Sequence, residues 1–293
     1  MTDEKVFFKY QKIDKYCIKN LSENQLYFRD PTKFNDLFDC QVLLDGRASK
    51  EDWIVRCLDR GMPLDEANAL LSGALTLGVC RKEDGILVFC PDDEDREILK
   101  RERYWDLHWD LKIESIPGVC CFSKNDKNIL MWSHCANEHR SICLRFRFGD
   151  GWISDNIREV KYVDEVYLLK AFDEDIESKV REVLCKKFSV WEYEQEYRIF
   201  LNANAFGKRV VKYEKTDLER VIFGLRISRE DATSVYNIIR ENYLSNGIDV
   251  DFCKAESVRG KYEIKYKKID DIDEYLNGLE PALKLPDDGY ICW

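Results

Sequence analysis

A strict alternation in residues 141–148, SICLRFRF, is the sequence feature that most constrains the fold. Side chains of an extended strand point alternately to opposite faces of its sheet, so this period places the apolar residues together and Arg145 and Arg147 on the other face. The apolar set is Ile142, Leu144, Phe146 and Phe148. The pattern predicts a strand with one face in a core.

Further strand patterns lie on both sides of this segment. They are GVCCFS at 118–123, EYRIFL at 196–201, KRVVKY at 208–213, LERVIFGL at 218–225, IDVDFCKAES at 248–257 and KYEIKYKKI at 261–269. An earlier strand is expected within 24–30, and helical patterns separate several of these runs. Ser228 is an expected N-cap for one such helix, in SREDATSVYNIIREN. The arrangement predicts an α+β fold with a mixed or antiparallel central sheet.

Residues 46–117 differ from this strand-rich part and predict a helical insert. In PLDEANALLSGALTL, apolar side chains recur at helical spacing, and Pro63 suits a first turn. The apolar positions are Leu64, Ala67, Leu71, Ala74 and Leu75. A second helical candidate is DEDREILKRERYWDLHWDLKIES at 93–115. Because no long flexible linker is visible, we expect 1–293 to form a single α+β domain containing the insert.

Charge and cysteine content restrict the classes of function. The chain has 293 residues and a formal net charge of −10, so it lacks the general basic footprint of a nucleic-acid-binding protein. Its start, MTDEKVFFKY, has no apolar core of a secretory signal, and no run approaches the ~20 apolar residues of a membrane span. We therefore expect a cytoplasmic protein without a membrane partner, whose 12 cysteines are reduced and mostly buried.

The segment WEYEQEYRIF, residues 191–200, is the first candidate site. On a strand, Glu194 and Glu196 would point to one face, next to Arg198. Two neighbouring carboxylates raise one another's pKa, and a guanidinium lowers it again. This pattern fits a carboxylate site, and it equally fits an exposed edge strand neutralised by the arginine.

Four segments together carry a family resemblance: LYFRDPTKFNDLFDC, CFSKNDKNILMWSHCANEHRSICLRF, WEYEQEYRIF and ERVIFGL. In this order they resemble the bacterial family known as domain of unknown function 2971, from about Phe8 to Gly224. The chain departs from the family pattern at Cys135, where tyrosine is usual, and at Leu37, where proline is usual. The resemblance implies a bacterial protein, often associated with defence or mobile elements, such as a toxin-like effector.

A second resemblance, at the level of pattern, is to ADP-ribosyltransferases. LYFR, CFSKNDKNILMWSHCA and EQEYRIF are similar in order and type to the Arg strand, the Ser strand with its helix, and the Glu strand of those enzymes. This implies an NAD-using transferase or NAD hydrolase in which Arg29 holds the pyrophosphate, Ser123 orients the binding strand and Trp132 stacks on a planar ring. Glu196 would contact the ribose, and Glu194 would orient an acceptor, either a protein or a nucleic acid.

Tyr27, His134 and Arg198 complete the expected cleft, with His134 as a general base or acceptor-orienting group. Each residue also has a structural alternative: Arg29 as a surface residue, Ser123 as a turn cap, Trp132 as core, and His134 as a buried ring bonded to a backbone carbonyl. His134, Cys135, His139 and Cys143 are possible zinc ligands, but no metal is expected. A helix that aligned Cys135, His139 and Cys143 would leave no room for the SICLRF strand, and Cys120 and Cys121 are adjacent instead of two apart.

Two other functions remain open. One is a non-catalytic sensor that binds a ligand or phage component in the same cleft. For each function, a protein regulator or a second copy of the chain is a candidate partner. The other is a metal-dependent nuclease that uses Asp36 and Asp39 with the two glutamates. In FNDLFDC, however, Asn35 and Asp36 also suit a tight structural turn.

Overall fold

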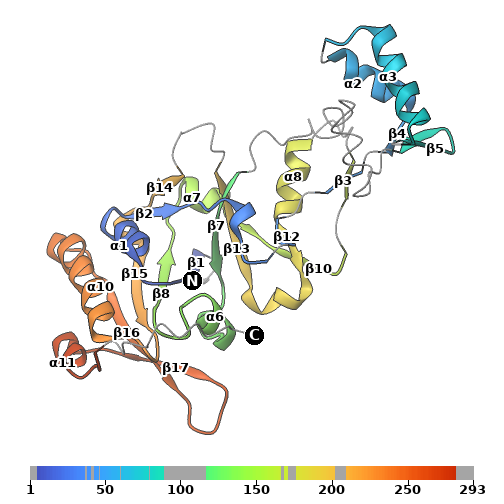
Figure 1. The fold of residues 1–293 in the computed structure, drawn as a ribbon. Coiled ribbons are helices and arrows are strands. Elements are labelled where there is room, and N and C mark those ends of the chain that lie inside the picture. Colours follow the sequence, from blue (N-terminus) through green and yellow to red (C-terminus); the bar gives the residue numbers. More distant parts are fainter. Residues whose placement is uncertain are drawn as a thin grey trace. The chain divides into compact units, whose positions relative to one another are not determined.

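The computed structural model describes residues 5–36, 38–40, 43–45, 47–59, 61–78, 80–88, 117–165, 168–170, 176–201 and 209–281. Its contacts divide the chain into two compact units. Unit 1 comprises 1–30, 118–160 and 190–293, and unit 2 comprises 31–117 and 161–189. Figure 1 shows the elements of both.

Unit 1 is built on an eight-stranded sheet with the order β17-β16-β15-β8-β1-β7-β13-β9. The strands are β1 (Val6–Gln11), β7 (Gly118–Ser123), β8 (Ile142–Arg147), β9 (Arg158–Glu159), β13 (Glu196–Leu201), β15 (Leu218–Phe223), β16 (Asp251–Ser257) and β17 (Ile264–Lys268). The pair β15–β16 is parallel, and the other neighbouring pairs are antiparallel. The sheet is therefore mixed, which confirms the predicted α+β class.

One face of this sheet packs against α1 (Lys15–Ser22), α10 (Arg229–Asn242) and α11 (Ile272–Asn277). The four apolar side chains of β8 and its extension, predicted from the alternation, all lie in this core and are at most 2% exposed. Helix α10 begins as predicted, because the Ser228 hydroxyl accepts a hydrogen bond from the Asp231 N–H at 3.1 Å.

The opposite face packs against α6 (Ile129–His134), which follows β7 after a short connection. Asn128 caps α6 by accepting from the N–H groups of Leu130 and Met131. After α6 the chain returns to β8 through three consecutive residues with positive φ, Asn137, Glu138 and His139. This return brings the His139 carbonyl against Gly224, where a Cβ would lie 2.3 Å from the oxygen.

A two-stranded sheet of β2 (Gln25–Tyr27) and β14 (Val210–Lys212) also belongs to unit 1. Near it are α7 (Trp152–Asn156), which follows β8, and η4 (Lys215–Asp217), which leads from β14 into β15. A further short turn, η5 (Leu244–Asn246), follows α10. Segments far apart in sequence thus converge beyond the end of β8.

Unit 2 contains the described part of the predicted insert. Its elements are η2 (Pro31–Lys33), β3 (Leu43–Asp45), β4 (Arg47–Ala48), α2 (Lys50–Asp59), α3 (Leu64–Thr76), β5 (Arg81–Glu83), β6 (Ile86–Val88), β10 (Lys161–Val163), β11 (Leu168–Lys170), α8 (Ile176–Leu184) and β12 (Lys186–Phe188). In α3, Ala67, Leu71 and Ala74 are buried, whereas Leu64 and Leu75 are exposed. The helix predicted at 93–115 lies outside the described residues.

Membrane-spanning character is not found in the described ranges: none of their helices combines sufficient length with sufficient apolar content.

Candidate functional site

Glu194 and Glu196 do not share one strand face, so that expectation from WEYEQEYRIF is wrong. Glu194 ends the 3-10 helix η3 (Ser189–Glu194), and β13 begins only at Glu196. Between them Gln195 has φ of 44°, a left-handed conformation outside the strand region. The two-residue alternation of a strand therefore does not apply across this step.

Glu196 and Arg198 form a buried, two-point ion pair. Arg198 Nε donates to Glu196 Oε1 at 2.7 Å, and its Nη2 donates to Oε2 at 2.9 Å. The residues are 5% and 0% exposed. Such a fork-to-fork contact satisfies both charged groups away from water. Glu196 is thus paired, inside the fold, with a residue of the same strand.

Ser123 lies directly opposite Glu196 in the β7–β13 pair. Its hydroxyl is buried, donates to the Glu194 carbonyl at 2.5 Å and accepts from the Asn125 N–H at 2.9 Å. The Ser123 hydroxyl therefore links the end of β7 to the residues that precede β13. Its contacts match the predicted alternative of a turn-capping residue.

Trp132 is fully buried, and its ring is a core group. It contacts Tyr10 edge-on at 5.3 Å between centroids, lies parallel to the His139 ring at 6.2 Å, and donates from Nε1 to the Asp126 carbonyl at 3.2 Å. No face of the indole is open for a ligand. His134 is exposed at the end of α6, where its Nδ1 lies 3.3 Å from the Tyr193 hydroxyl.

Tyr27 and Arg29 are exposed, and Tyr27 pairs with Val210 of β14. Arg29 pairs with Val119, four residues before Ser123. At a strand rise of about 3.3 Å per residue, the two positions are about 13 Å apart along β7. The structure thus brings Ser123, Glu196 and Arg198 together and leaves Arg29 away from them.

Asn35 and Asp36 belong to unit 2. The Asp36 side chain accepts a hydrogen bond from the Phe38 N–H at 2.9 Å, the pattern of an Asx turn. Asp39 pairs with Lys187 at 3.3 Å, and both groups are buried. These acids therefore have structural contacts of their own.

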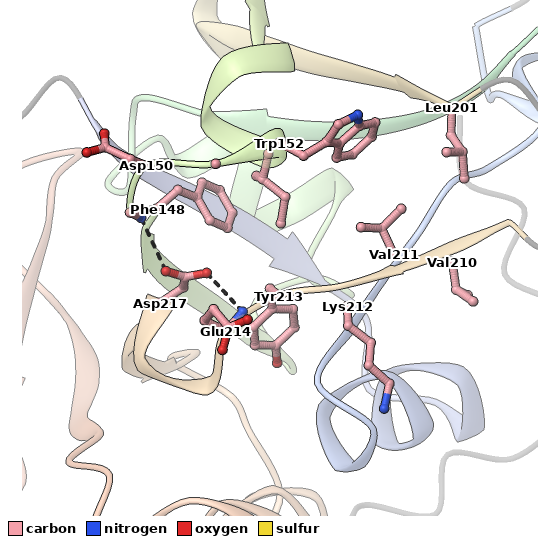
Figure 2. A pocket seen from close by; sticks show the side chains of 13 residues that line it. Phe148, Asp150, Trp152, Leu201, Val210, Val211, Lys212, Tyr213, Glu214 and Asp217 are labelled. Atoms are coloured by element: carbon pink, nitrogen blue, oxygen red, sulfur yellow. Dashed lines mark hydrogen bonds between the residues drawn. The ribbon is translucent and has the colours of Figure 1, made fainter.

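A cavity of about 570 Å³ lies elsewhere in unit 1, between α7 and β14 (Figure 2). Its lining residues come from three segments: Phe148, Gly149, Asp150, Gly151, Trp152 and Ile153; Leu201; and Val210, Val211, Lys212, Tyr213, Glu214 and Asp217. None of the predicted site residues is among them. Among these lining residues, Trp152 is 43% exposed, whereas Phe148, Leu201 and Tyr213 are buried core residues.

The charged side chains of the lining are those of Asp150, Glu214 and Asp217, with Lys212 as the basic one. Asp217 joins two of its segments, because its carboxylate accepts from the Gly149 N–H at 3.3 Å and from the Glu214 N–H at 3.1 Å. Burial raises the pKa of Asp217 above its usual 3.8, against the two backbone hydrogen bonds. Glu214 is exposed, and Asp150 pairs with Lys5. The cavity thus combines apolar lining residues with three acids and one lysine.

Sequence reasoning missed this cavity because its segments are about 60 residues apart. One signal was present: GDGW at 149–152 places a tryptophan directly after turn residues.

The described ranges contain no group of three or more His, Cys, Asp or Glu side chains arranged to hold a metal ion. Comparison of the chain with protein-family models, with curated proteins and with solved structures finds no match. Both family resemblances stay predictions, and the geometry of unit 1 supplies the argument about function.

Proposed function

We propose that the protein is a binding module that recognises its ligand through the cavity between α7 and β14. The cavity carries the proposal: about 570 Å³ lies within the ordinary range of ligand pockets. It has an apolar lining, a few polar groups and a carboxylate with a raised pKa, Asp217. This proposal corresponds to the sensor alternative, but with the cavity as its binding site instead of the predicted cleft.

The lining indicates the kind of ligand. Phe148, Leu201 and Val211 offer apolar contacts, and Trp152 offers a partly exposed ring. Asp150 is already paired with Lys5, so the carboxylates of Glu214 and Asp217, beside the basic lining residue Lys212, are the ones that favour a positive charge and disfavour phosphate. We therefore infer a ligand that combines an apolar or aromatic group with a cationic one. A dinucleotide fits this rim poorly.

Dye binding tests the pocket directly. Fluorescence titration with Nile red, a neutral probe, should show binding that Trp152→Ala weakens by about tenfold, or about 1.4 kcal/mol. Tyr262→Ala is the matched control, because Tyr262 is a fully exposed aromatic residue outside the cavity. Equal affinities of Trp152→Ala and the unaltered protein would remove the proposal.

Charge selectivity supplies a second readout. At low salt the cationic dye ethidium should bind more tightly than the anionic dye 8-anilinonaphthalene-1-sulfonate, and Glu214→Gln should reduce the difference. Salt should reduce it too, since exposed charges are screened. A preference for the anionic dye would contradict the inferred ligand class.

A second candidate is the NAD-using transferase or hydrolase. The observation in its favour is that Ser123 and Glu196 are cross-strand partners and that α6 follows Ser123 closely. Incubation with NAD and detection of released nicotinamide tests it, with Glu194→Gln and Glu196→Gln as variants. Release that both variants abolish would support it, and no release, with or without protein or RNA acceptors, would oppose it.

The cytoplasm is the compartment we propose. Within the described ranges, free thiols include those of Cys17, Cys120, Cys121, Cys143 and Cys253, and all of these except Cys121 are buried. Free thiols persist in a reducing compartment.

A further inference from the structure

The hydrogen bonds of β14 define which of its backbone groups are directed away from β2. Phe28 N–H donates to the Arg209 carbonyl, and Tyr213 N–H donates to the Asn24 carbonyl. In an antiparallel pair, bonded and non-bonded residue pairs alternate. The register pairs Val210 with Tyr27 and Val211 with Leu26, so Val211 bonds to β2 whereas Val210 and Lys212 present their N–H and C=O groups outward.

This outward edge lies along the cavity. Val210, Val211, Lys212 and Tyr213 are consecutive lining residues, so the cavity follows the strand over its whole length. In the described part of the chain, β14 pairs with β2 and with no other strand. An edge of this kind is a template for a further strand, which would use the outward N–H and C=O groups.

We propose that the ligand is an extended peptide that adds to the β2–β14 sheet as a third strand and places one side chain in the cavity. This inference rests on the proposed binding function and names its ligand class. Strand addition supplies affinity through the backbone of Val210 and Lys212, and the cavity supplies specificity for the side chain.

The side chains of the peptide follow from the lining. Alternate residues of a strand point to one face, so one apolar or aromatic residue enters between Trp152 and Val211. Figure 2 shows Lys212 and Asp150 both extending away from Val211, whereas Glu214 and Asp217 lie close to each other beside Tyr213. A lysine or arginine close to the apolar residue complements Glu214 and Asp217, in a protein whose net charge is −10.

Selection from a library of random ten-residue peptides displayed on phage tests the ligand class. Enriched peptides should contain an apolar or aromatic residue with a nearby lysine or arginine, and should compete with Nile red. N-methylation at successive positions of one selected peptide should then weaken binding at every second residue by about fivefold, the value of one hydrogen bond of about 1 kcal/mol.

Proline substitution tests the edge on the protein side. Val210→Pro removes an outward N–H and keeps the bonds to β2, so it should stay folded and lose the peptide. Val210→Ala is its matched control, because it shortens the same side chain and keeps the N–H. Val211→Pro removes a bond to β2 and should destabilise the fold instead, as measured by circular dichroism during urea unfolding.

The outcomes distinguish failure of the binding pocket from failure of strand addition. If Nile red binds at Trp152 and no peptide is enriched, or if N-methylation shows no alternation, the strand-addition inference fails and the binding pocket stands. If Trp152→Ala leaves Nile red affinity unchanged, the pocket itself fails. Equal peptide affinity of Val210→Pro and Val210→Ala would also overturn strand addition.

Discussion

Arg198 holds Glu196 from two positions further along β13, with both of its contacts, at 2.7 and 2.9 Å, made inside the fold. On the neighbouring strand β7, Cys121 lies opposite Arg198 and Ser123 lies opposite Glu196. Burial, and then the charge of Glu196, raises the pKa of the Cys121 thiol well above its usual value. The ion pair and the Cys121 thiol therefore lie on the same face of the two strands.

Removing both members of this pair should cost less unfolding free energy than the sum of the two single removals. Arg198→Met leaves the Glu196 carboxylate buried beside an apolar group, and a broken buried pair costs roughly 3–5 kcal/mol of unfolding free energy. The double variant Glu196→Leu/Arg198→Met removes both charges, so it should be less destabilised than the sum of the two single variants. Urea unfolding of the four proteins measures the coupling. Additive losses would contradict a mutual pairing.

Gly224 should not accept a side chain. Its N–H donates to the Ser141 carbonyl at 2.8 Å, and a Cβ on it would meet the His139 carbonyl oxygen at 2.3 Å. Because that oxygen belongs to backbone, Gly224→Ala should lower the unfolding free energy by about 1–3 kcal/mol. Gly149→Ala is the control: nothing lies within 4 Å of its added Cβ, and the stability should change little. Equal effects in urea unfolding would show that the close approach is unimportant.

The regular elements of unit 1 could be predicted because local rules determine them. The apolar alternation in β8 leads directly to four core side chains, and Ser228 followed by acids caps α10 as expected. Both patterns depend on neighbouring residues only. Burial in α3 was predicted less completely, since Leu64 and Leu75 lie on its margin and are exposed.

The candidate sites could not be predicted in the same way, because they depend on tertiary packing. Gln195 is a non-glycine residue with a left-handed backbone, and no composition rule marks it. The burial of Trp132 against Tyr10 and His139 requires knowledge of three segments together. The cavity likewise needs Trp152 and Val211 to meet across about 60 residues of sequence.

Stability should fall on mild acidification because of His139. Burial, followed by the charge of Arg226, lowers the pKa of His139 from its usual 6.5. The unfolded chain therefore binds this proton more readily than the folded one, so stability is complete above pH 6.5 and decreases as the pH falls below it. His139→Asn removes the ionisation and tolerates the φ of 65°. Urea midpoints at several pH values should show a flatter profile for this variant between pH 6.5 and 5; an unchanged profile would assign the effect to other groups.

The last prediction concerns two tyrosines between the cavity floor and α10. The Tyr243 hydroxyl donates to the Leu21 carbonyl at 3.0 Å, so it accepts from the Tyr213 hydroxyl at 2.7 Å. Tyr213→Phe leaves the bond to Leu21 intact, whereas Tyr243→Phe leaves both the Tyr213 hydroxyl and the Leu21 carbonyl without this partner.

Tyr243→Phe should therefore cost more unfolding free energy, about 1–3 kcal/mol, than Tyr213→Phe at about 1 kcal/mol or less. The double variant should lose no more unfolding free energy than Tyr243→Phe alone, because it also removes the Tyr213 hydroxyl, which has lost its acceptor in Tyr243→Phe. Urea unfolding of the three variants gives the ranking, and Nile red titration shows whether Tyr213, on the cavity floor, transmits the loss to the pocket. A larger cost for Tyr213→Phe than for Tyr243→Phe would contradict this direction. It would indicate that the Tyr243 hydroxyl donates to the Tyr213 hydroxyl instead of accepting from it.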